Sequence, residues 1–275
     1  IETAGELMDL LLDARKYYPT IHKEDLKVIV LEAMGEILPG FNKKLADFAK
    51  RKLVERGIEI ELKKAVTSFD GNEVTIKTLD ETPKDSIDQS EINSIITKTL
   101  IWTAGVTPVN TIKRSMFKTE KGKLIVNDFL EVQKFPGVFA IGDCALFVDP
   151  ITNRPFPPTA QIAESQAKIA AKNLISLIKN SNQEKFVYHS KGQMAIIGKR
   201  SGIATFLGVN ISGFVAWLIW RNVYLSKIPT FDKKTRVFLD WMIDLFFDRD
   251  ISRIKLMKHK SEKEYKELDE VDDVW

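Results

Sequence analysis

Residues 26–32 (LKVIVLE) form a short apolar run that ends in a carboxylate, Glu32. Such a run is typical of a strand that is buried on both faces of a parallel sheet. Residues 41–56 (FNKKLADFAKRKLVER) have the spacing of an amphipathic helix that Gly57 ends, and residues 58–62 (IEIEL) alternate as a strand does. The order of strand, helix and strand predicts a βαβ unit, and therefore an α/β fold of the doubly wound, Rossmann-like kind.

The chain opens with the pattern of a helix interior. Residues 1–7 (IETAGEL) contain no initiator Met and no signal segment, and apolar side chains recur at Leu7, Leu10 and Leu11. We therefore expect a helix from the first residues. We also interpret the chain as the C-terminal part of a longer protein, truncated at its N-terminus.

Two further strands are expected in the first domain, at residues 73–77 (EVTIK) and 99–102 (TLIW). The polar segment 80–94 is interpreted as a surface loop between them. We place the end of this α/β domain at residue 105, so that it covers residues 1–105.

A second piece of α/β sheet is expected at residues 106–183. Residues 124–126 (LIV) and 138–141 (VFAI) have the composition of strands, and the second of these leads into Gly142. Residues 159–178 predict a long helix. Its expected packing face consists of Ala163, Ala167, Ala170 and Ala171.

Residues 184–275 differ in composition, because the segment 186–231 contains no Asp or Glu. Residues 193–197 and 203–207 flank a Gly-containing turn and predict a hairpin. The uncharged stretch 201–220 is not interpreted as a transmembrane helix. Glycines and polar residues interrupt its first half, whereas about 20 apolar residues are needed to span a bilayer.

Composition excludes several classes of protein. Of 275 residues, 41 are Lys or Arg and 38 are Asp or Glu, so the net charge of +3 gives no support for bulk nucleic-acid binding. The single cysteine, Cys144, cannot form an intramolecular disulfide, and three scattered histidines provide no metal-ligand cluster. We expect a metal-free protein of a reducing compartment that binds no nucleic acid.

Two carboxylates that follow expected strands carry the first site predictions. Glu32 would accept hydrogen bonds from the hydroxyls of an adenosine ribose, and residues 33–35 contain no Arg for a ribose phosphate, which favours NAD over NADP. Asp143 would bind a polyol such as flavin ribitol, and the helix that begins at Thr159 would point N–H groups at an electron-rich ring. The alternatives are a surface glutamate and an ordinary strand-to-turn aspartate.

Three motifs together resemble a known family. Residues 139–145 (FAIGDCA), 102–106 (WTAGV) and 158–163 (PTAQIA) are similar to the two-dinucleotide-binding-domain flavoproteins, and more narrowly to the type II (non-proton-pumping) NADH:quinone oxidoreductases. Residues 1–7 resemble the segment directly after that family's NAD-binding glycine motif, and residues 213–220 resemble its membrane-anchoring C-terminus. The resemblance covers essentially the whole chain.

The resemblance implies FAD and NAD as cofactors, hydride transfer from NADH to the flavin, and reduction of a membrane quinone. It implies that residues 1–105 are a partial NAD-binding domain and residues 106–183 the C-terminal part of an FAD-binding domain. The implied catalytic residues are Glu2, near the nicotinamide, and Gln161, at the quinone; a helix-dipole role is an alternative for Glu2. The implied cofactor-binding residues are Glu32, Gly105, Gly142, Asp143, Ala160 and Gln161.

Two departures from the family pattern matter. The glycine fingerprints for FAD and NAD are absent from this chain, so the parent protein is expected to be the enzyme and the fragment alone to be inactive. In the family's quinone motif the second Gln would fall on Ser165, and Gln166 is displaced by one residue, which is about 100° around a helix. The roles of Ser165 and Gln166 stay open.

Residues 184–275 are predicted to associate with a membrane surface. Trp and Phe recur in two short helices at 214–224 and 237–246, with Lys and Arg around them and at 249–258, as in helices that lie in the headgroup plane. We expect peripheral binding to anionic lipid at the cytoplasmic face of the cell membrane; the alternative is an aromatic core or a homodimer face. The side chains expected to insert are Trp217, Trp220, Phe238 and Trp241.

Two other functions stay open at this stage. Another FAD-dependent NAD(P)H or sulfide:quinone reductase would share the fold, although sulfide chemistry uses catalytic cysteines and this chain has only Cys144. A non-catalytic membrane-binding module would need no flavin. A flavin spectrum of the parent protein separates the enzyme from the module.

Overall fold

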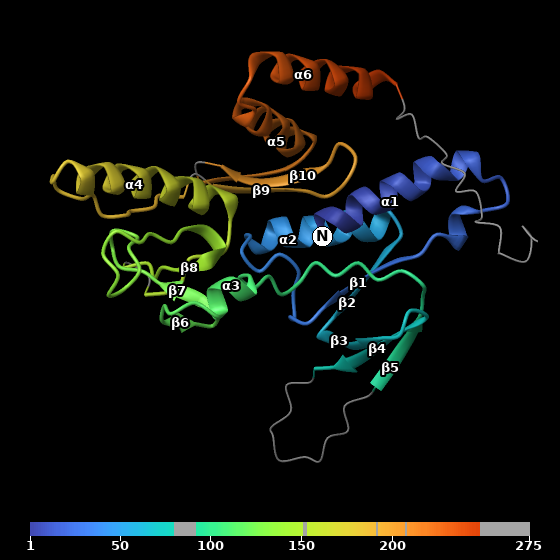
Figure 1. The fold of residues 1–275 in the computed structure, drawn as a ribbon. Coiled ribbons are helices and arrows are strands. Elements are labelled where there is room, and N and C mark those ends of the chain that lie inside the picture. The colour runs from blue at the N-terminus through green and yellow to red at the C-terminus, as the bar shows by residue number, and fades with distance from the viewer. Residues whose placement is uncertain (80–91, 151–152, 191, 207, 248–275) are drawn as a thin grey trace, which may run out of the picture. The chain divides into compact units, whose positions relative to one another are not determined.

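The computed structural model describes residues 1–79, 92–150, 153–190, 192–206 and 208–247. The chain divides into two compact units, Ile1–Lys98 with Gly192–Trp275, and Thr99–Lys191, each built from helices and strands (Figure 1). The predicted α/β fold class is confirmed. The boundaries expected after residues 105 and 183 stay predictions, and the cations at 249–258 lie outside the described residues.

The first unit contains the predicted βαβ arrangement. Its first elements are α1 (Glu2–Ala14), the 3-10 turns η1 (Arg15–Tyr17) and η2 (Lys23–Asp25), β1 (Val28–Glu32), α2 (Lys43–Glu55) and β2 (Ile58–Leu62). Strands β1 and β2 pair in parallel, with Glu32 opposite Leu62. The Asn42 side chain caps α2 by accepting from the amide of Lys44 at 3.0 Å, and Gly57 follows α2 with a φ of +94°.

A three-stranded antiparallel sheet follows in the same unit. Its strands, in spatial order, are β3 (Lys64–Phe69), β4 (Glu73–Thr78) and β5 (Ile92–Ile96). The strand expected at 73–77 is confirmed, whereas β3 is not predicted by the sequence pattern. The loop prediction is wrong for residues 92–94, which belong to β5, and its residues 80–91 lie outside the described chain.

The prediction of a strand at residues 99–102 is wrong. This apolar run is irregular, and none of the strands in the described ranges pairs with it, so its hydrophobic side chains gain no cross-strand packing. Trp102 is 62% exposed, and its indole nitrogen donates to the carbonyl of Ala104 at 2.6 Å.

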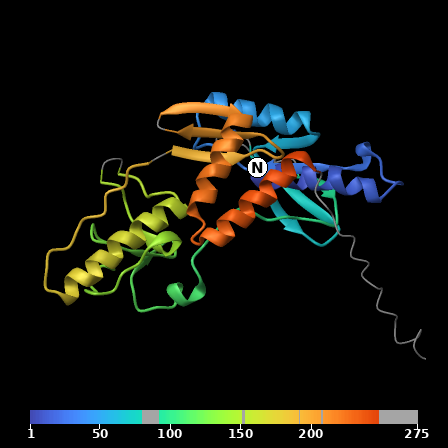
Figure 2. The same cartoon turned by 90° about the horizontal axis from the view of Figure 1, so that it is seen from above.

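The C-terminal part of the first unit is an antiparallel sheet followed by two helices. The elements are β9 (Gly192–Ile196), β10 (Gly202–Phe206), β11 (Val209–Gly213), α5 (Phe214–Lys227) and α6 (Phe231–Phe246). The predicted hairpin is confirmed as β9 and β10, while β11 is a strand that its flanking glycines conceal in the sequence. Helices α5 and α6 run at an angle to each other from the short turn between them (Figure 2). No helix in the described ranges is long and apolar enough to cross a bilayer.

The second unit is built around one long helix. Its elements are α3 (Asn110–Lys113), β6 (Thr119–Glu120), β7 (Lys123–Ile125), η3 (Gly142–Cys144), β8 (Ala145–Leu146) and α4 (Ala160–Ile178). The strand expected at 124–126 is confirmed as β7, which pairs with β6 and β8. No full strand forms at 138–141: Phe139 makes a single antiparallel bridge with Glu131, beside which Val132 donates to the carbonyl of Val138 and Ala140 donates to that of Leu130.

Helix α4 covers the predicted segment, and its inward face agrees only in part with the expected alanines, of which Ala170 is buried. Its buried residues are Ile162, Gln166, Ala170 and Asn173, whereas Ala171 is exposed. The large apolar side chain of Ile162 contributes more buried area than an alanine and therefore decides which face packs on the core.

Each unit has its own hydrophobic core. The core of the first unit brings Met8 of α1, Leu53 of α2 and Ile58 of β2 together with Ile197 and Ile203 of the C-terminal hairpin. The core of the second unit joins the long helix to the irregular chain through Leu130, Val132, Phe147, Ile162 and Phe186.

Candidate functional site

The Gly-Asp pair lies in the short turn η3, directly against α4. Gly142 has a φ of +64°, and a Cβ atom built on it would lie 3.3 Å from the Cβ of Ala163. Both the left-handed backbone and this close approach favour glycine. The turn places Asp143 at the surface, where its carboxylate is exposed.

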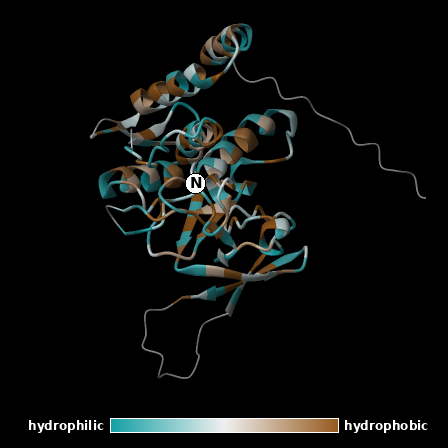
Figure 3. Cartoon of the chain, turned by 60° about the vertical axis from the view of Figure 1, so that its left-hand side comes forward, coloured by the Kyte–Doolittle hydropathy of each residue, from teal (hydrophilic) through white to brown (hydrophobic). Residues whose placement is uncertain are grey.

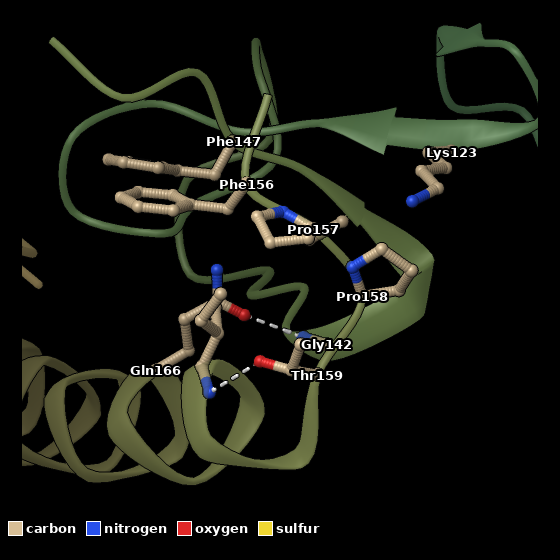
Figure 4. Close-up of a pocket in the computed structure, with 10 residues that line it drawn as sticks. Lys123, Gly142, Phe147, Phe156, Pro157, Pro158, Thr159 and Gln166 are labelled. Carbon is tan, nitrogen blue, oxygen red and sulfur yellow. Dashed lines mark hydrogen bonds between the residues drawn. The ribbon is translucent and has the colours of Figure 1, made fainter. Parts of the chain in front are cut away.

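A buried glutamine fastens this turn to the helix. Gln166 is 2% exposed, and its Oε1 atom accepts a hydrogen bond from the amide of Gly142 at 2.7 Å. Figure 4 shows the side chain of Gln166 reaching from α4 toward Gly142 and Thr159. These three residues line a small pocket together with Lys123, Ala145, Phe147, Phe156, Pro157, Pro158 and Ile162.

The N-terminus of α4 is open for a ligand. The side chain of Thr159 accepts from the amide of Ile162 at 3.4 Å, and no acidic residue stands in the first turn of the helix. The first amides of a helix have no acceptor within it, so those of Ala160 and Gln161 remain available for another group. These donors and the carboxylate of Asp143 fit a flavin, which has acceptor atoms on its ring and hydroxyl groups on its ribitol.

Gln161 is bonded to a residue outside the helix. The hydroxyl of Tyr188 donates to Oε1 of Gln161 over 3.2 Å. The ring of Tyr188 packs on Phe156, with centroids 5.7 Å apart, and on Phe186, at 6.5 Å. Gln161 therefore lies at the border between the open helix end and an aromatic cluster.

Glu32 occupies the carboxyl edge of the parallel pair. It is the last residue of β1, and its Oε1 atom accepts from the amide of Met34 at 2.8 Å. This bond fixes the loop after the strand and leaves the second carboxylate oxygen for a ligand. Ligands of open α/β sheets bind beyond the carboxyl ends of the strands, so the position fits the ribose of a dinucleotide.

The remaining predicted residues, Glu2 and Gly105, lie in other elements. Glu2, the first residue of α1, accepts a hydrogen bond from the amide of Ile196 at 2.9 Å, and thus ties the helix to β9. Gly105 has a φ of +73° in the irregular segment before α3, and a Cβ atom built on it would contact nothing within 4 Å. Gly142, Asp143, Ala160 and Gln161 are brought together by η3 and the start of α4, whereas Glu2 and Glu32 belong to the other unit.

Sequence reasoning left the role of Gln166 open and missed Tyr188. Gln166 follows Ile162 by four residues and precedes Ala170 by four, so a polar amide on the apolar face of α4 was the available signal. Tyr188 carries no signal along the sequence, because only the tertiary packing brings it to Gln161.

A parallel strand that ends in glutamate and a Gly-Asp turn fastened to a helix N-terminus fit the dinucleotide-binding class of α/β protein. The chain belongs to the family of pyridine nucleotide-disulphide oxidoreductases, which residues 1–167 match. More particularly, residues 190–250 match the NDH2 C-terminal domain. The predicted resemblance to the type II NADH:quinone oxidoreductases is thereby confirmed.

The chain is similar to several curated proteins. It is 33% identical to a probable NADH dehydrogenase of Dictyostelium discoideum, over 92% of this chain and 53% of that protein. It is 29% identical to the type II NADH:quinone oxidoreductase Ndh of Mycobacterium tuberculosis, over 90% of this chain and 52% of the relative. The chain thus spans about half the length of these relatives.

The fold also resembles a solved structure. The NDH2 of Plasmodium falciparum in complex with NADH matches with a TM-score of 0.77 at 18% identity, over 92% of this chain and 65% of that one. At this identity the likeness concerns the fold alone.

Proposed function

We propose that the full-length protein that carries this chain is an FAD-dependent NADH:quinone oxidoreductase. The observation that carries the proposal is the Gly142-Asp143 turn, bonded through buried Gln166 to an α4 N-terminus whose first amides are open. The similarity to type II NADH:quinone oxidoreductases along most of the chain supports the same activity.

The second unit would hold the flavin. Asp143 would accept hydrogen bonds from ribitol hydroxyls. The amides of Ala160 and Gln161 would donate to acceptor atoms of the flavin ring. Because Gly105 has no side chain, its backbone could come close to the flavin. When bound, FAD supplies the chemistry that accepts a hydride and passes electrons on. The side chain of Gln161 is proposed to contact the quinone. Gln166 is buried against Gly142, so we assign it to holding the turn rather than to touching the quinone.

The first unit would bind NADH through Glu32. Its carboxylate, already oriented by the amide of Met34, would accept the ribose hydroxyls and repel a ribose phosphate. Glu2 is proposed to lie near the nicotinamide. Its bond to the amide of Ile196 gives the carboxylate a fixed place between α1 and β9.

Helix α6 is proposed to dock on the surface of an anionic membrane, on the cytoplasmic side. None of its described residues is buried, and Figure 3 shows hydrophobic residues along this helix, which leads into the grey C-terminal trace. Its exposed apolar side chains recur at helical spacing and form one stripe. They are Phe231, Phe238, Leu239, Met242, Ile243 and Phe246.

The structure corrects one expected membrane contact. Trp217 is only 5% exposed, and the guanidinium of Arg221 stacks on its ring at 4.0 Å and on Trp241 at 4.8 Å. Arg221 also donates to the carbonyl of Trp241 at 3.0 Å. Trp217 is therefore part of the joint between α5 and α6 and is not available for lipid.

The activity is tested on the purified full-length protein. We expect a flavin absorbance spectrum that NADH bleaches without oxygen and that a short-chain quinone restores. A protein without flavin, or one whose reduced flavin the quinone does not reoxidise, would contradict the proposal.

Membrane docking is tested by ending the chain after Pro229. A cut before Ile211 would remove part of β11 and the buried residues Ala216 and Trp217, so loss of folding would obscure the result. A chain that ends after Pro229 loses α6 and keeps that sheet and α5. We expect it to stay in solution without vesicle binding, to keep NADH oxidation with ferricyanide and to lose most reduction of lipid-embedded quinone. Loss of FAD in this variant would instead identify α6 as a core or homodimer contact.

A further inference from the structure

The side chain of Gln161 is held at one end by a residue far along the chain. Tyr188 Oη donates to Gln161 Oε1 over 3.2 Å, although 27 residues separate the two. Gln161 stands in the first turn of α4, at the open helix end, and both side chains are only partly buried.

The position of the hydroxyl is set by packing. The ring of Tyr188 lies edge-on to Phe156 and stacks with Phe186 at an interplanar angle of 22°. Phe186 is 2% exposed and also contacts Phe147, with centroids 5.1 Å apart. Only the torsions χ1 and χ2 place the hydroxyl oxygen of a tyrosine. Packing of the Tyr188 ring between Phe156 and Phe186 fixes both torsions and therefore the position of the hydroxyl oxygen.

The hydrogen bond determines which end of the amide faces outward. A carboxamide has an acceptor end, the oxygen, and a donor end, the NH2 group. Because Tyr188 occupies the oxygen, the NH2 group of Gln161 is left for a ligand. A quinone carbonyl can only accept hydrogen bonds, so it needs a donor at this place.

We propose that Tyr188 is a positioning residue of the quinone site, which acts by turning the NH2 group of Gln161 toward the quinone carbonyl. This inference rests on the proposed function, in which Gln161 contacts the quinone. Tyr188 has no contact of its own with the quinone in this proposal. An experiment can therefore distinguish an effect through Gln161 from a direct effect on the quinone.

The test uses the full-length, FAD-loaded protein and a double-mutant cycle. Tyr188→Phe removes the hydroxyl and keeps the ring, Gln161→Ala removes the amide, and the double variant removes both. Tyr17→Phe is the matched control, since it deletes the hydroxyl of an exposed tyrosine in η1. FAD content per chain and the KM and kcat for a short-chain quinone are measured for each.

We expect Tyr188→Phe to raise the quinone KM about 2- to 12-fold, the range of one neutral hydrogen bond, with an unchanged FAD content. In the Gln161→Ala background the same change is expected to have no further effect, because Tyr188 acts through Gln161. Gln161→Glu keeps the acceptor for Tyr188 but removes the NH2 group, so it too is expected to raise the quinone KM.

Three results would overturn the inference. An unchanged quinone KM in Tyr188→Phe would show that the hydroxyl has no role, and an equal effect in the Gln161→Ala background would mean that Tyr188 acts on the quinone directly. An unchanged KM in Gln161→Glu would refute the donor assignment. A wild-type protein that holds FAD and oxidises NADH but reduces no quinone would instead refute the proposed function, and the inference with it.

Discussion

Gly142 shows how one residue decides the geometry of the flavin-type turn. Its positive φ and its close approach to Ala163 disfavour larger residues, and its amide is bonded to buried Gln166. Asp143 reaches the surface because the residue before it turns the chain so sharply. A local hydrogen bond likewise orients the side chain of Glu32, whose carboxylate accepts from the amide of Met34.

Glu32→Gln is expected to change the choice of nucleotide. The amide oxygen of Gln can still accept from Met34, so the variant removes the charge and keeps the loop. We expect a higher KM for NADH and a higher ratio of kcat/KM for NADPH over NADH, because a neutral side chain no longer repels a ribose phosphate. Steady-state kinetics of the full-length protein with both nucleotides measure this. Glu59→Gln, on the neighbouring strand, is the control, and equal kinetics in the two variants would remove Glu32 from the site.

Asp143→Ala is expected to weaken FAD binding. A hydrogen bond to a charged group contributes about 1.5–3 kcal/mol, which corresponds to roughly 10- to 150-fold in the dissociation constant. FAD per chain after gel filtration is the measurement. Asp128→Ala, which removes an exposed ion pair with Lys185 in the same unit, serves as the control. Stoichiometric FAD in Asp143→Ala would assign a purely structural role to this carboxylate.

At the scale of elements, single hydrogen bonds join segments that are distant in sequence. Asp9 of α1 pairs with Arg56 at 3.5 Å, and the Arg56 guanidinium donates to the carbonyl of Ile197 at 2.7 Å and to that of Lys199 at 2.9 Å. Gly5 lets α1 lie close to the backbone of Ile197, because a Cβ atom on Gly5 would lie 2.6 Å from the carbonyl oxygen of Ile197. Helix α1 and the β9–β10 turn therefore form one packed element pair.

The turn between β3 and β4 is expected to give a pH-dependent contribution to stability. The amides of Asn72 and Glu73 donate to Asp70 at 2.8 and 2.7 Å, and these bonds hold the pKa of the Asp70 carboxyl below its ordinary value. A carboxyl whose pKa is lower in the folded state stabilises the fold above its unfolded pKa of about 3.9, and the contribution disappears as the pH falls through the folded pKa. We expect Asp70→Ala to lower the urea midpoint at pH 7 and to differ less from the wild type in acid. A constant difference between the two proteins from pH 7 into acid would argue against this account.

At the scale of the whole molecule, α6 is an amphipathic helix whose apolar stripe is exposed in the described part of the chain. The described residues of α6 are all at least partly exposed, and α6 is attached to α5 through Arg221, whose guanidinium lies 3.9 Å from Asp244. At helical spacing, the cations Lys234 and Arg236 fall at the two edges of the apolar stripe. A helix of this kind is suited to a lipid surface, with its apolar side inserted and its cations on anionic headgroups.

Lys234→Gln with Arg236→Gln is expected to weaken binding to anionic vesicles. Each surface cation contributes about 1 kcal/mol, so the pair corresponds to roughly 30-fold in affinity at low salt, and less at high salt. Sedimentation with vesicles that contain anionic lipid is the measurement, and Lys44→Gln with Lys50→Gln on α2 is the charge-matched control. Binding that is indifferent to salt and to these substitutions would indicate a protein partner for α6.

The sequence alone determined the elements whose side chains carry a clear period, and the residues that local backbone chemistry requires. The βαβ order, the C-terminal hairpin and the aromatic helices follow from hydrophobic spacing, and the position of Glu32 follows from the end of its strand. The apolar runs at 99–102 and 138–141 have the composition of strands. The first pairs with none of the strands in the described ranges, and the second forms only one antiparallel bridge, Phe139 with Glu131, because pairing is a property of the tertiary structure. The contact between Gln161 and Tyr188 could not be predicted for the same reason. The two residues are 27 positions apart in the sequence, and only the packing of the Tyr188 ring in the folded protein brings them together.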